Sequence, residues 1–319
     1  MRRLLCLAVL GGILLAGCAR PSGGSSQATA AAATHGREVT GSIVVGGLKR
    51  TYRLHLPPQI AQDAPLPLVL ALHGRLGDGA GMSRLTHVST VADQFGFLVA
   101  FPDGYQRSWA DGRGATSADK ASVDDVAFLR QVIATVRGLY AVDATRIYAT
   151  GISNGGFMSQ RLGCELAGTL AGIASVAATL SVNLAACAPA FPMPYLLIEG
   201  TDDPLVPYQG GTVNDERGTV LSAMASLRRW ASFDDCTPPL TQNDIPDIVK
   251  DGTHILYSGF PSCAGGAQTG LYTVEHGGHA WPGGQQYLPG ALIGKTSGNM
   301  EASVVIWQFL AQFTRGTQA

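Results

Sequence analysis

Continuous apolar runs, each followed by turn residues, mark the middle of the chain. Residues 66–72 and 97–101 are two such runs, and each is followed by a glycine-containing turn. A strand that is covered on both faces carries apolar side chains on both, so unbroken runs of this length predict strands of a parallel sheet. Further strands are expected at 146–150, 173–177, 195–198, 254–257 and 271–275.

Apolar residues recur at helical spacing between and after these strands. In the segment 123–140 they include Val126, Leu129 and Ile133, which share one face of a helix. The aspartate pair at 124–125 suits the positive end of that helix dipole. Two further helices are expected at about 156–166 and at 301–313.

The beginning of this pattern differs from the rest. Residues 42–45 and 51–56 flank Gly46-Gly47, which is typical of an antiparallel hairpin. Strands that then alternate with helices predict an α/β fold, a doubly wound and mostly parallel sheet with antiparallel N-terminal strands. Residues 207–250 are irregular and polar, so we expect them to decorate the sheet rather than form a module.

The N-terminal segment has the pattern of an export signal. Two arginines precede the apolar run 4–15, which is too short to cross a bilayer of about 30 Å as a helix. The run ends in Leu15-Ala16-Gly17-Cys18, which resembles the lipobox of bacterial lipoproteins. We therefore expect a signal peptide at 1–17, a lipidated Cys18 with a flexible tether over 18–38, and one folded domain over 39–319. An ordinary signal peptide with an incidental cysteine is the alternative.

Composition and cysteine content narrow the class further. The net charge of −1 gives no electrostatic reason to expect nucleic acid as a partner, and the membrane enters only through the expected lipid anchor on Cys18. This anchor predicts a cell-envelope protein, at the outer membrane or the cell surface or released from it.

Four cysteines remain after Cys18, an even count that predicts two disulfides in an oxidising compartment. Three pairings are open, and closing small loops in chain order favours Cys164–Cys187 and Cys236–Cys263. No Cys-x-x-Cys spacing indicates a metal site.

The strongest chemical signal is Gly151-Ile152-Ser153-Asn154-Gly155, between an expected strand and an expected helix. This pattern is typical of a nucleophile elbow, a sharp turn in which glycines two before and two after the serine let strand and helix approach closely. A lone Gly-x-Ser-x-Gly is a weak signal in a chain with 41 glycines. Its position between strand and helix makes Ser153 a candidate nucleophile.

A serine hydroxyl needs a base, and in this fold the acid and then the histidine follow the serine along the chain. His279 is the favoured base because it lies in a loop after the last expected strand, and His276 nearby is a possible supporting residue. The acid should follow the strand at 195–198. Asp202 and Asp203 both qualify by position, and spacing alone does not separate them.

Acyl transfer also needs two backbone N–H groups that stabilise an oxyanion. Asn154, directly after the serine and at a helix N-terminus, should supply one of them. The loop after the strand at 66–72 should supply the other, from the N–H of Arg75. His73 in the same loop is expected to be structural.

Five motifs at the expected strand ends support one family when they are taken together. They are Leu72-His73-Gly74, Phe101-Pro102-Asp103-Gly104, Gly151-Ile152-Ser153-Asn154-Gly155-Gly156, the segment from Gly200 to Tyr208, and Gly278-His279-Ala280-Trp281-Pro282-Gly283.

This set resembles the secreted polyhydroxybutyrate depolymerase and feruloyl esterase family of α/β-hydrolases, from about residue 39 to 315. The resemblance implies Asp203 as the triad acid and His279 as the base. The chain departs from the family at Arg75, where a cysteine often stands, and at Glu199, where many members have histidine.

These residues predict a serine esterase that forms an acyl-enzyme and needs no metal or organic cofactor. Trp281, Trp109 and Tyr208 are candidates to hold the substrate, with ordinary packing as the alternative for each. No polymer-binding appendage is visible, so soluble or oligomeric esters are the expected substrates. A peptidase or acyltransferase with the same triad, and a lipid-anchored binding protein without activity, are the alternative functions.

Overall fold

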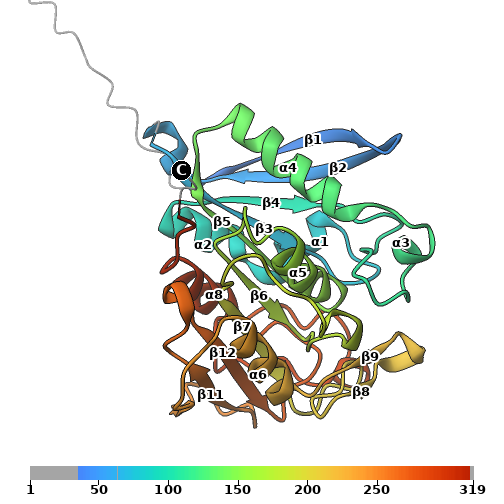
Figure 1. Ribbon diagram of the computed structural model, residues 1–319, viewed down its shortest axis with the longest axis vertical. Coiled ribbons are helices and arrows are strands. Elements are labelled where there is room, and N and C mark those ends of the chain that lie inside the picture. The colour runs from blue at the N-terminus through green and yellow to red at the C-terminus, as the bar shows by residue number, and fades with distance from the viewer. Residues whose placement is uncertain (1–34, 63, 317–319) are drawn as a thin grey trace, which may run out of the picture. The chain divides into compact units, whose positions relative to one another are not determined.

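The main feature of the computed structural model is a ten-stranded sheet in the order β1-β2-β4-β3-β5-β6-β7-β12-β11-β10 (Figure 1). The structure describes residues 35–62 and 64–316. The expected signal peptide, Cys18 and most of the tether therefore lie outside the described residues. The strands are β1 (Arg37–Val45), β2 (Leu48–Leu56), β3 (Leu66–Leu72), β4 (Leu98–Pro102), β5 (Val142–Ile152), β6 (Gly172–Val176), β7 (Tyr195–Gly200), β10 (Thr241–Ile245), β11 (His254–Phe260) and β12 (Thr269–Glu275).

The six central strands, from β4 to β12, run parallel, and the expected doubly wound α/β architecture is confirmed. β1 and β2 form the expected antiparallel hairpin, in which Val45 pairs with Leu48. Gly46 and Gly47 between them have φ of 56° and 79°, which glycine adopts at no steric cost. The other edge is antiparallel as well, because β11 runs antiparallel to β12 and β10 runs antiparallel to β11. This second antiparallel edge is not among the elements expected from the sequence pattern.

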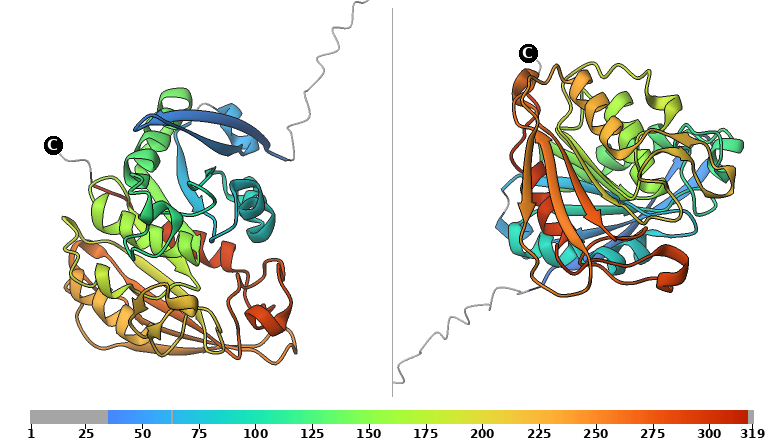
Figure 2. Two further views of the ribbon diagram at one scale, coloured as in Figure 1. Left: turned by 90° about the vertical axis from the view of Figure 1, so that its right-hand side faces the viewer. Right: turned by 90° about the horizontal axis from the view of Figure 1, so that it is seen from below.

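Helices cover both faces of the sheet, as the views in Figure 2 show. α4, α5 and α6 share one apolar core with alternate residues of β3, Leu68 and Leu70. α1, α2 and α8 share the other core with Val69 and Ala71 of the same strand. The continuous apolar run therefore has the two-sided burial that its pattern predicts. The helices are α1 (Gly79–Thr86), α2 (Val88–Phe95), α3 (Ser117–Lys120), α4 (Asp125–Leu139), α5 (Asn154–Glu165), α6 (Ala223–Phe233), α7 (Gly290–Ile293) and α8 (Ala302–Leu310).

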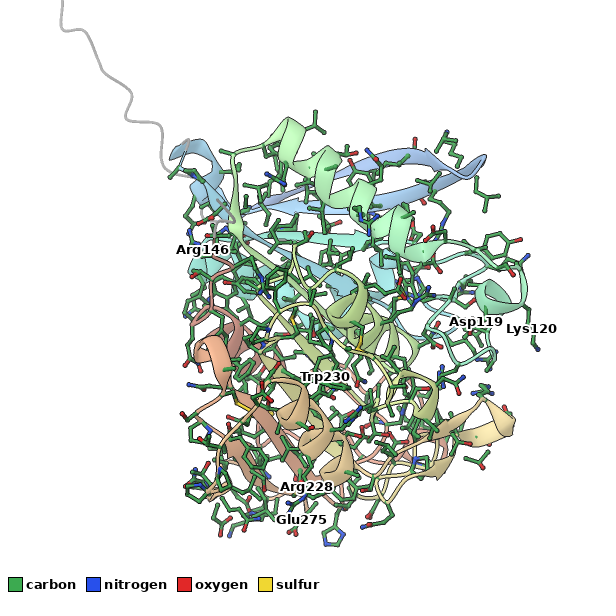
Figure 3. All side chains as sticks on the ribbon, viewed as in Figure 1. Asp119, Lys120, Arg146, Arg228, Trp230 and Glu275 are labelled. Carbon is green, nitrogen blue, oxygen red and sulfur yellow. A yellow bond between two sulfur atoms is a disulfide. The ribbon has the colours of Figure 1, made fainter. Side chains whose placement is uncertain are left out.

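The prediction that residues 207–250 are irregular is wrong in one important part, because α6 lies within them. Its N-cap is Ser222, whose side chain accepts the N–H of Ala225. Leu227 and Trp230 on its inner face are fully buried, and Trp230, labelled in Figure 3, stacks on Tyr195 of β7 at 4.9 Å between ring centroids. Its buried residues Ala223, Leu227, Trp230 and Ala231 recur at helical spacing, so the sequence carried a signal for this helix that the prediction missed. The same region also supplies the edge strand β10 of the main sheet and a two-stranded ribbon of β8 (Gly211–Thr212) and β9 (Thr219–Val220).

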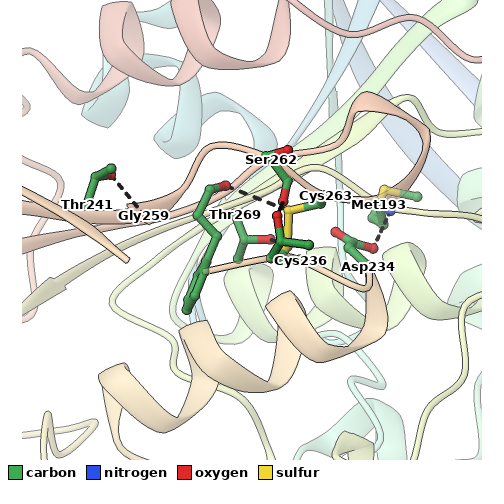
Figure 4. Close-up of a disulfide and its surroundings, with 10 residues drawn as sticks. Met193, Asp234, Cys236, Thr241, Gly259, Ser262, Cys263 and Thr269 are labelled. Carbon is green, nitrogen blue, oxygen red and sulfur yellow. Dashed lines mark hydrogen bonds between the residues drawn. A yellow bond between two sulfur atoms is a disulfide. The ribbon is translucent and has the colours of Figure 1, made fainter. Parts of the chain in front are cut away.

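Two disulfides join the pairs that chain order favours. Cys164–Cys187 ties the C-terminal turn of α5 to the loop before β7. Cys236–Cys263 ties the segment after α6 to the loop before β12 (Figure 4). Disulfides persist in oxidising compartments, so both fit an exported protein. No helix in the described ranges is long and apolar enough to cross a membrane.

A buried carboxyl group lies beside the second disulfide (Figure 4). Asp234 ends α6, is fully buried, and accepts the backbone N–H of Met193 at 2.7 Å. Its second oxygen has no hydrogen-bond partner in the described structure. Burial raises the pKa of Asp234 to about 7, although the Met193 N–H and Arg315 act in the opposite direction.

This carboxyl group should make stability depend on pH. An aspartate titrates near 4 in the unfolded chain, so between about pH 4 and 7 the folded state holds the extra proton and stability falls as the pH rises. The loss attributable to this group is at most roughly 4 kcal/mol. We expect Asp234→Asn to remove this part of the dependence of stability on pH. Comparing the urea midpoints of wild type and variant at pH 5 and at pH 8 measures the change.

The exposed neighbour provides the matched control. Asp235→Asn should change the slope far less than Asp234→Asn, because the Asp235 carboxylate is exposed to solvent and its charge is only a minor cause of the raised pKa of Asp234. Equal pH slopes for wild type and Asp234→Asn would contradict the assignment.

Candidate active site

Ser153, Asp203 and His279 follow three strands whose carboxyl ends meet at one edge of the sheet. Ser153 follows β5 directly, Asp203 lies three residues after β7, and His279 lies four residues after β12. These strands run parallel within the order β5-β6-β7-β12. Ligand sites of open α/β sheets lie at this edge, because the loops after parallel strands converge there.

Ser153 occupies a strained turn between β5 and α5. Its φ of 56° and ψ of −124° lie outside the regions that side-chain-bearing residues favour. A Cβ on Gly151 would lie 2.5 Å from the carbonyl group of Gly155, and a Cβ on Gly155 would overlap the carbonyl oxygen of Leu72. Glycine at both positions is therefore a steric requirement of this turn, as the elbow pattern predicts.

His279 and Asp203 form a buried pair. His279 Nδ1 lies 2.7 Å from Asp203 Oδ2, and the two side chains are 2% and 0% exposed. Asp203 Oδ1 accepts the backbone N–H groups of Leu205 and Val206 at 2.7 and 2.8 Å. These two donors orient the carboxylate, so that Oδ2 faces the imidazole.

The two residues that spacing left as alternatives pair with each other instead. His276 Nδ1 lies 3.5 Å from Asp202 Oδ2, and both side chains are more than half exposed. An ion pair that is exposed to water in this way contributes little to the stability of the fold. In the described structure no hydrogen bond joins the Ser153 hydroxyl to His279. In unliganded structures this contact is often long and tightens only when substrate binds.

The two expected oxyanion donors are unpaired backbone N–H groups. Asn154 is the first residue of α5, and neither its N–H nor that of Arg75 makes a hydrogen bond within the described ranges. The Asn154 side chain is committed elsewhere: its Oδ1 accepts the N–H of Trp109, and its Nδ2 donates to Asp111 Oδ2 at 2.6 Å. A Cβ on Gly74, beside Arg75, would lie 3.4 Å from the Ser153 Cβ, so this loop lies against the nucleophile candidate.

His73 has the structural role expected for it. It is 2% exposed, its Nδ1 contacts the carbonyl oxygen of Gly74 at 2.7 Å, and its Nε2 accepts the N–H of Gly104 at 2.9 Å. Burial lowers the pKa of His73, so the ring is neutral and can accept that bond. It thereby fixes the loop that carries Arg75 to the turn after β4.

The structure corrects two of the substrate-binding candidates. Trp109 is fully buried and its indole N–H donates to the carbonyl oxygen of His73 at 2.9 Å. Trp281 is 1% exposed and its indole N–H donates to Ser303 at 3.1 Å. Both tryptophans pack in the interior, because each indole N–H finds a protein partner there. Tyr208 is half-buried with its hydroxyl group 2.7 Å from that of Thr273, and its contact with substrate stays a prediction.

Two buried acidic residues near the site were not assigned a role from the sequence. Asp111 holds the Asn154 side chain and pairs with Arg113 at 2.7 Å, while Arg113 lies over the Phe157 ring. Glu199 at the end of β7 is 1% exposed. Neither lies in a periodic pattern that would indicate its burial.

Within residues 35–62 and 64–316, no cluster of histidine, cysteine or acidic side chains is arranged to hold a metal ion.

Comparison with known proteins agrees with this geometry. A family model described as esterase PHB depolymerase matches residues 50–190. The NocK protein of Nocardia uniformis subsp. tsuyamanensis, which is named as an esterase, is 30% identical over 84% of this chain and 81% of its own length. This chain belongs to the esterase PHB depolymerase family.

Further similarities extend this assignment. Feruloyl esterase B of Piromyces equi is 33% identical to this esterase over 70% of the present chain, which spans 41% of that longer protein. The solved acetyl xylan esterase of Aspergillus awamori superimposes with a TM-score of 0.53 at 13% identity, over 76% of this chain and 94% of its own. That likeness shows the shared α/β-hydrolase fold. The family identifies the chain as a carboxylic ester hydrolase.

Proposed function

We propose that this esterase hydrolyses its substrates through a Ser153–His279–Asp203 triad and a covalent acyl-enzyme. The observation that carries the proposal is the buried Asp203–His279 pair, at the same sheet edge as the strained Ser153 turn. A buried carboxylate on Nδ1 keeps the imidazole in the tautomer that can accept a proton at Nε2. The exposed Asp202–His276 pair offers no comparable environment.

In the proposed first half-reaction, Ser153 Oγ bonds to the ester carbonyl carbon and its proton moves to His279 Nε2. The negative charge that develops on the carbonyl oxygen is stabilised by the N–H groups of Asn154 and Arg75, with the positive end of the α5 dipole behind Asn154. The bond to the alcohol oxygen then breaks, and His279 donates its proton to the leaving alkoxide. In the second half-reaction, water attacks the acyl carbon while His279 Nε2 takes its proton. The bond between the acyl carbon and Ser153 Oγ then breaks, and His279 returns the proton to Oγ, which releases the acid and restores Ser153.

We propose soluble or oligomeric esters as the substrate class. A relative named feruloyl esterase and a family model named for polyhydroxybutyrate depolymerase support phenolic esters of sugars and hydroxyalkanoate oligomers as the two chemistries to compare. Relative kcat/KM on a feruloylated sugar and on a hydroxybutyrate oligomer separates them.

We further propose that the protein is anchored by a lipid on Cys18. The lipobox-like segment and the two disulfides support this, since both belong to exported proteins. Metabolic labelling of the full chain with a fatty acid, and its loss in Cys18→Ala, tests the anchor separately from catalysis.

A fluorophosphonate probe tests the proposed nucleophile directly. We expect it to label Ser153 stoichiometrically and to abolish hydrolysis of p-nitrophenyl acetate. Without the probe, the enzyme should show an initial burst of p-nitrophenol release from this ester if deacylation limits turnover. Peptide anilides should be turned over far more slowly. Labelling at another residue would overturn the triad, and preferential cleavage of the anilides would favour a peptidase.

A further inference from the structure

Glu199 is a buried carboxyl group for which the proposed reaction has no use. It lies on β7, one residue before the strand ends, and is 1% exposed. Neither of its side-chain oxygens makes a hydrogen bond to a donor in the described structure. An unpaired buried carboxylate is costly, because it loses hydration and gains no donor in return.

Asp203 lies four residues further along the chain, and its backbone N–H lies 3.4 Å from the carbonyl oxygen of Gly200, so the chain turns back at the end of β7. Its side chain is 0% exposed, and its charge raises the pKa of the Glu199 carboxyl group. Two neighbouring carboxylates in a buried site cannot both be ionised at neutral pH. One of the two must therefore carry a proton.

The donors around the pair decide which one carries it. Asp203 accepts three hydrogen bonds, from Leu205, Val206 and His279, and a carboxylate has about four acceptor positions. These donors favour its ionised form, whereas a protonated Glu199 would itself supply the missing donor for the remaining position.

The surroundings of Glu199 favour the same distribution. Burial and the adjacent Asp203 raise the pKa of Glu199 well above its ordinary value, and the nearby N–H of Ala178 opposes them only in part. Tyr195 and Tyr208 also face it, and burial raises the pKa of both phenols, so they add no charge. His279 reaches the pair only through Asp203.

We propose that Glu199 is a positioning residue: as a neutral carboxylic acid it donates its hydroxyl hydrogen to Asp203 and holds that carboxylate against His279. The inference rests on the proposed triad. In this role Glu199 neither contacts the substrate nor takes part in proton transfer to the substrate.

Two substitutions separate the hydrogen bond from simple packing. Glu199→Gln keeps a neutral donor of nearly the same shape and should retain most of kcat. Glu199→Leu keeps the volume without a donor and should lower kcat about 10-fold, with KM within about 2-fold, because a hydrogen bond to a charged group near the reacting atoms is lost. Glu165→Gln, at the half-exposed end of α5, is the matched control and should equal wild type.

The charge of Glu199 is tested by Glu199→Gln alone, so the test does not depend on whether the leucine variant folds. An ionised Glu199 would stabilise the imidazolium, and its removal would shift the acidic limb of the kcat/KM profile to lower pH. A neutral Glu199 predicts no shift. The infrared difference spectrum between wild type and Glu199→Gln at neutral pH should also contain the C=O stretch of a protonated carboxyl group.

A shifted acidic limb, a missing carboxylic acid band, or a glutamine variant as slow as the leucine variant would overturn this inference. These outcomes are distinct from failure of the triad itself. If Ser153→Ala keeps wild-type activity, the proposed function fails. If that variant is inactive while both Glu199 variants match wild type in rate, only the role of Glu199 fails.

Discussion

Ser153→Ala is expected to lower kcat for p-nitrophenyl acetate by at least about 10⁴-fold, because covalent catalysis ends with the loss of Oγ. The residual rate should come from substrate binding and the oxyanion donors, which remain in place. Steady-state kinetics with purified enzyme, corrected for uncatalysed hydrolysis, measures the change.

The same variant should fold as well as wild type. Alanine keeps the Cβ of Ser153 and therefore the same strain at φ 56°, and Ser153 makes no side-chain hydrogen bond within the described residues that the change would remove. We expect its urea midpoint to match that of wild type. Ser42→Ala on β1, an exposed serine far along the sheet order, is the matched control for activity and stability. Substantial esterase activity in Ser153→Ala would refute the assignment of the nucleophile.

Asp203→Asn is expected to lower kcat by about 10³- to 10⁴-fold with little effect on KM. Oδ1 of Asp203 accepts two backbone N–H groups, so the oxygen of an asparagine must take that place. Its NH₂ group would then face His279 Nδ1, where Oδ2 now lies 2.7 Å away. This arrangement makes Nδ1 the acceptor and puts the proton on Nε2, which can then no longer accept the proton of Ser153.

Asp202→Asn is the matched control for this substitution. It changes the adjacent residue in the same way, but its carboxylate is more than half exposed and interacts with the exposed His276 and the Thr201 hydroxyl group. We expect its kcat to stay within about 2-fold of wild type, since exposed ion pairs contribute little. Equal losses in the two variants would show that the effect arises from the turn after β7 rather than from the buried pair.

The parts of the fold that repeat a local pattern were predictable from the sequence. The run 66–72 is the β3 strand to the residue, and Ser153 stands between β5 and α5 as the elbow motif requires. These features depend on neighbours along the chain: apolar side chains on both faces of a strand, and glycine where strand and helix approach closely. α6 was also predictable, because Ala223, Leu227, Trp230 and Ala231 recur at helical spacing, but the polar character of the whole region led to an irregular assignment.

The sequence by itself determined the mostly parallel sheet, the elbow at Ser153 and the chain order of candidate acid and base. Spacing left Asp202 and Asp203 open and only the family resemblance favoured Asp203; the tertiary structure buries Asp203 with His279, leaves Asp202 with His276 in solvent, and encloses Trp109 and Trp281. It also buries Glu199 at the end of β7, where the charge of Asp203 raises the pKa of its carboxyl group. Adjacent residues share the same local pattern, so their separation depends on how the loops after β7 and β12 fold against each other.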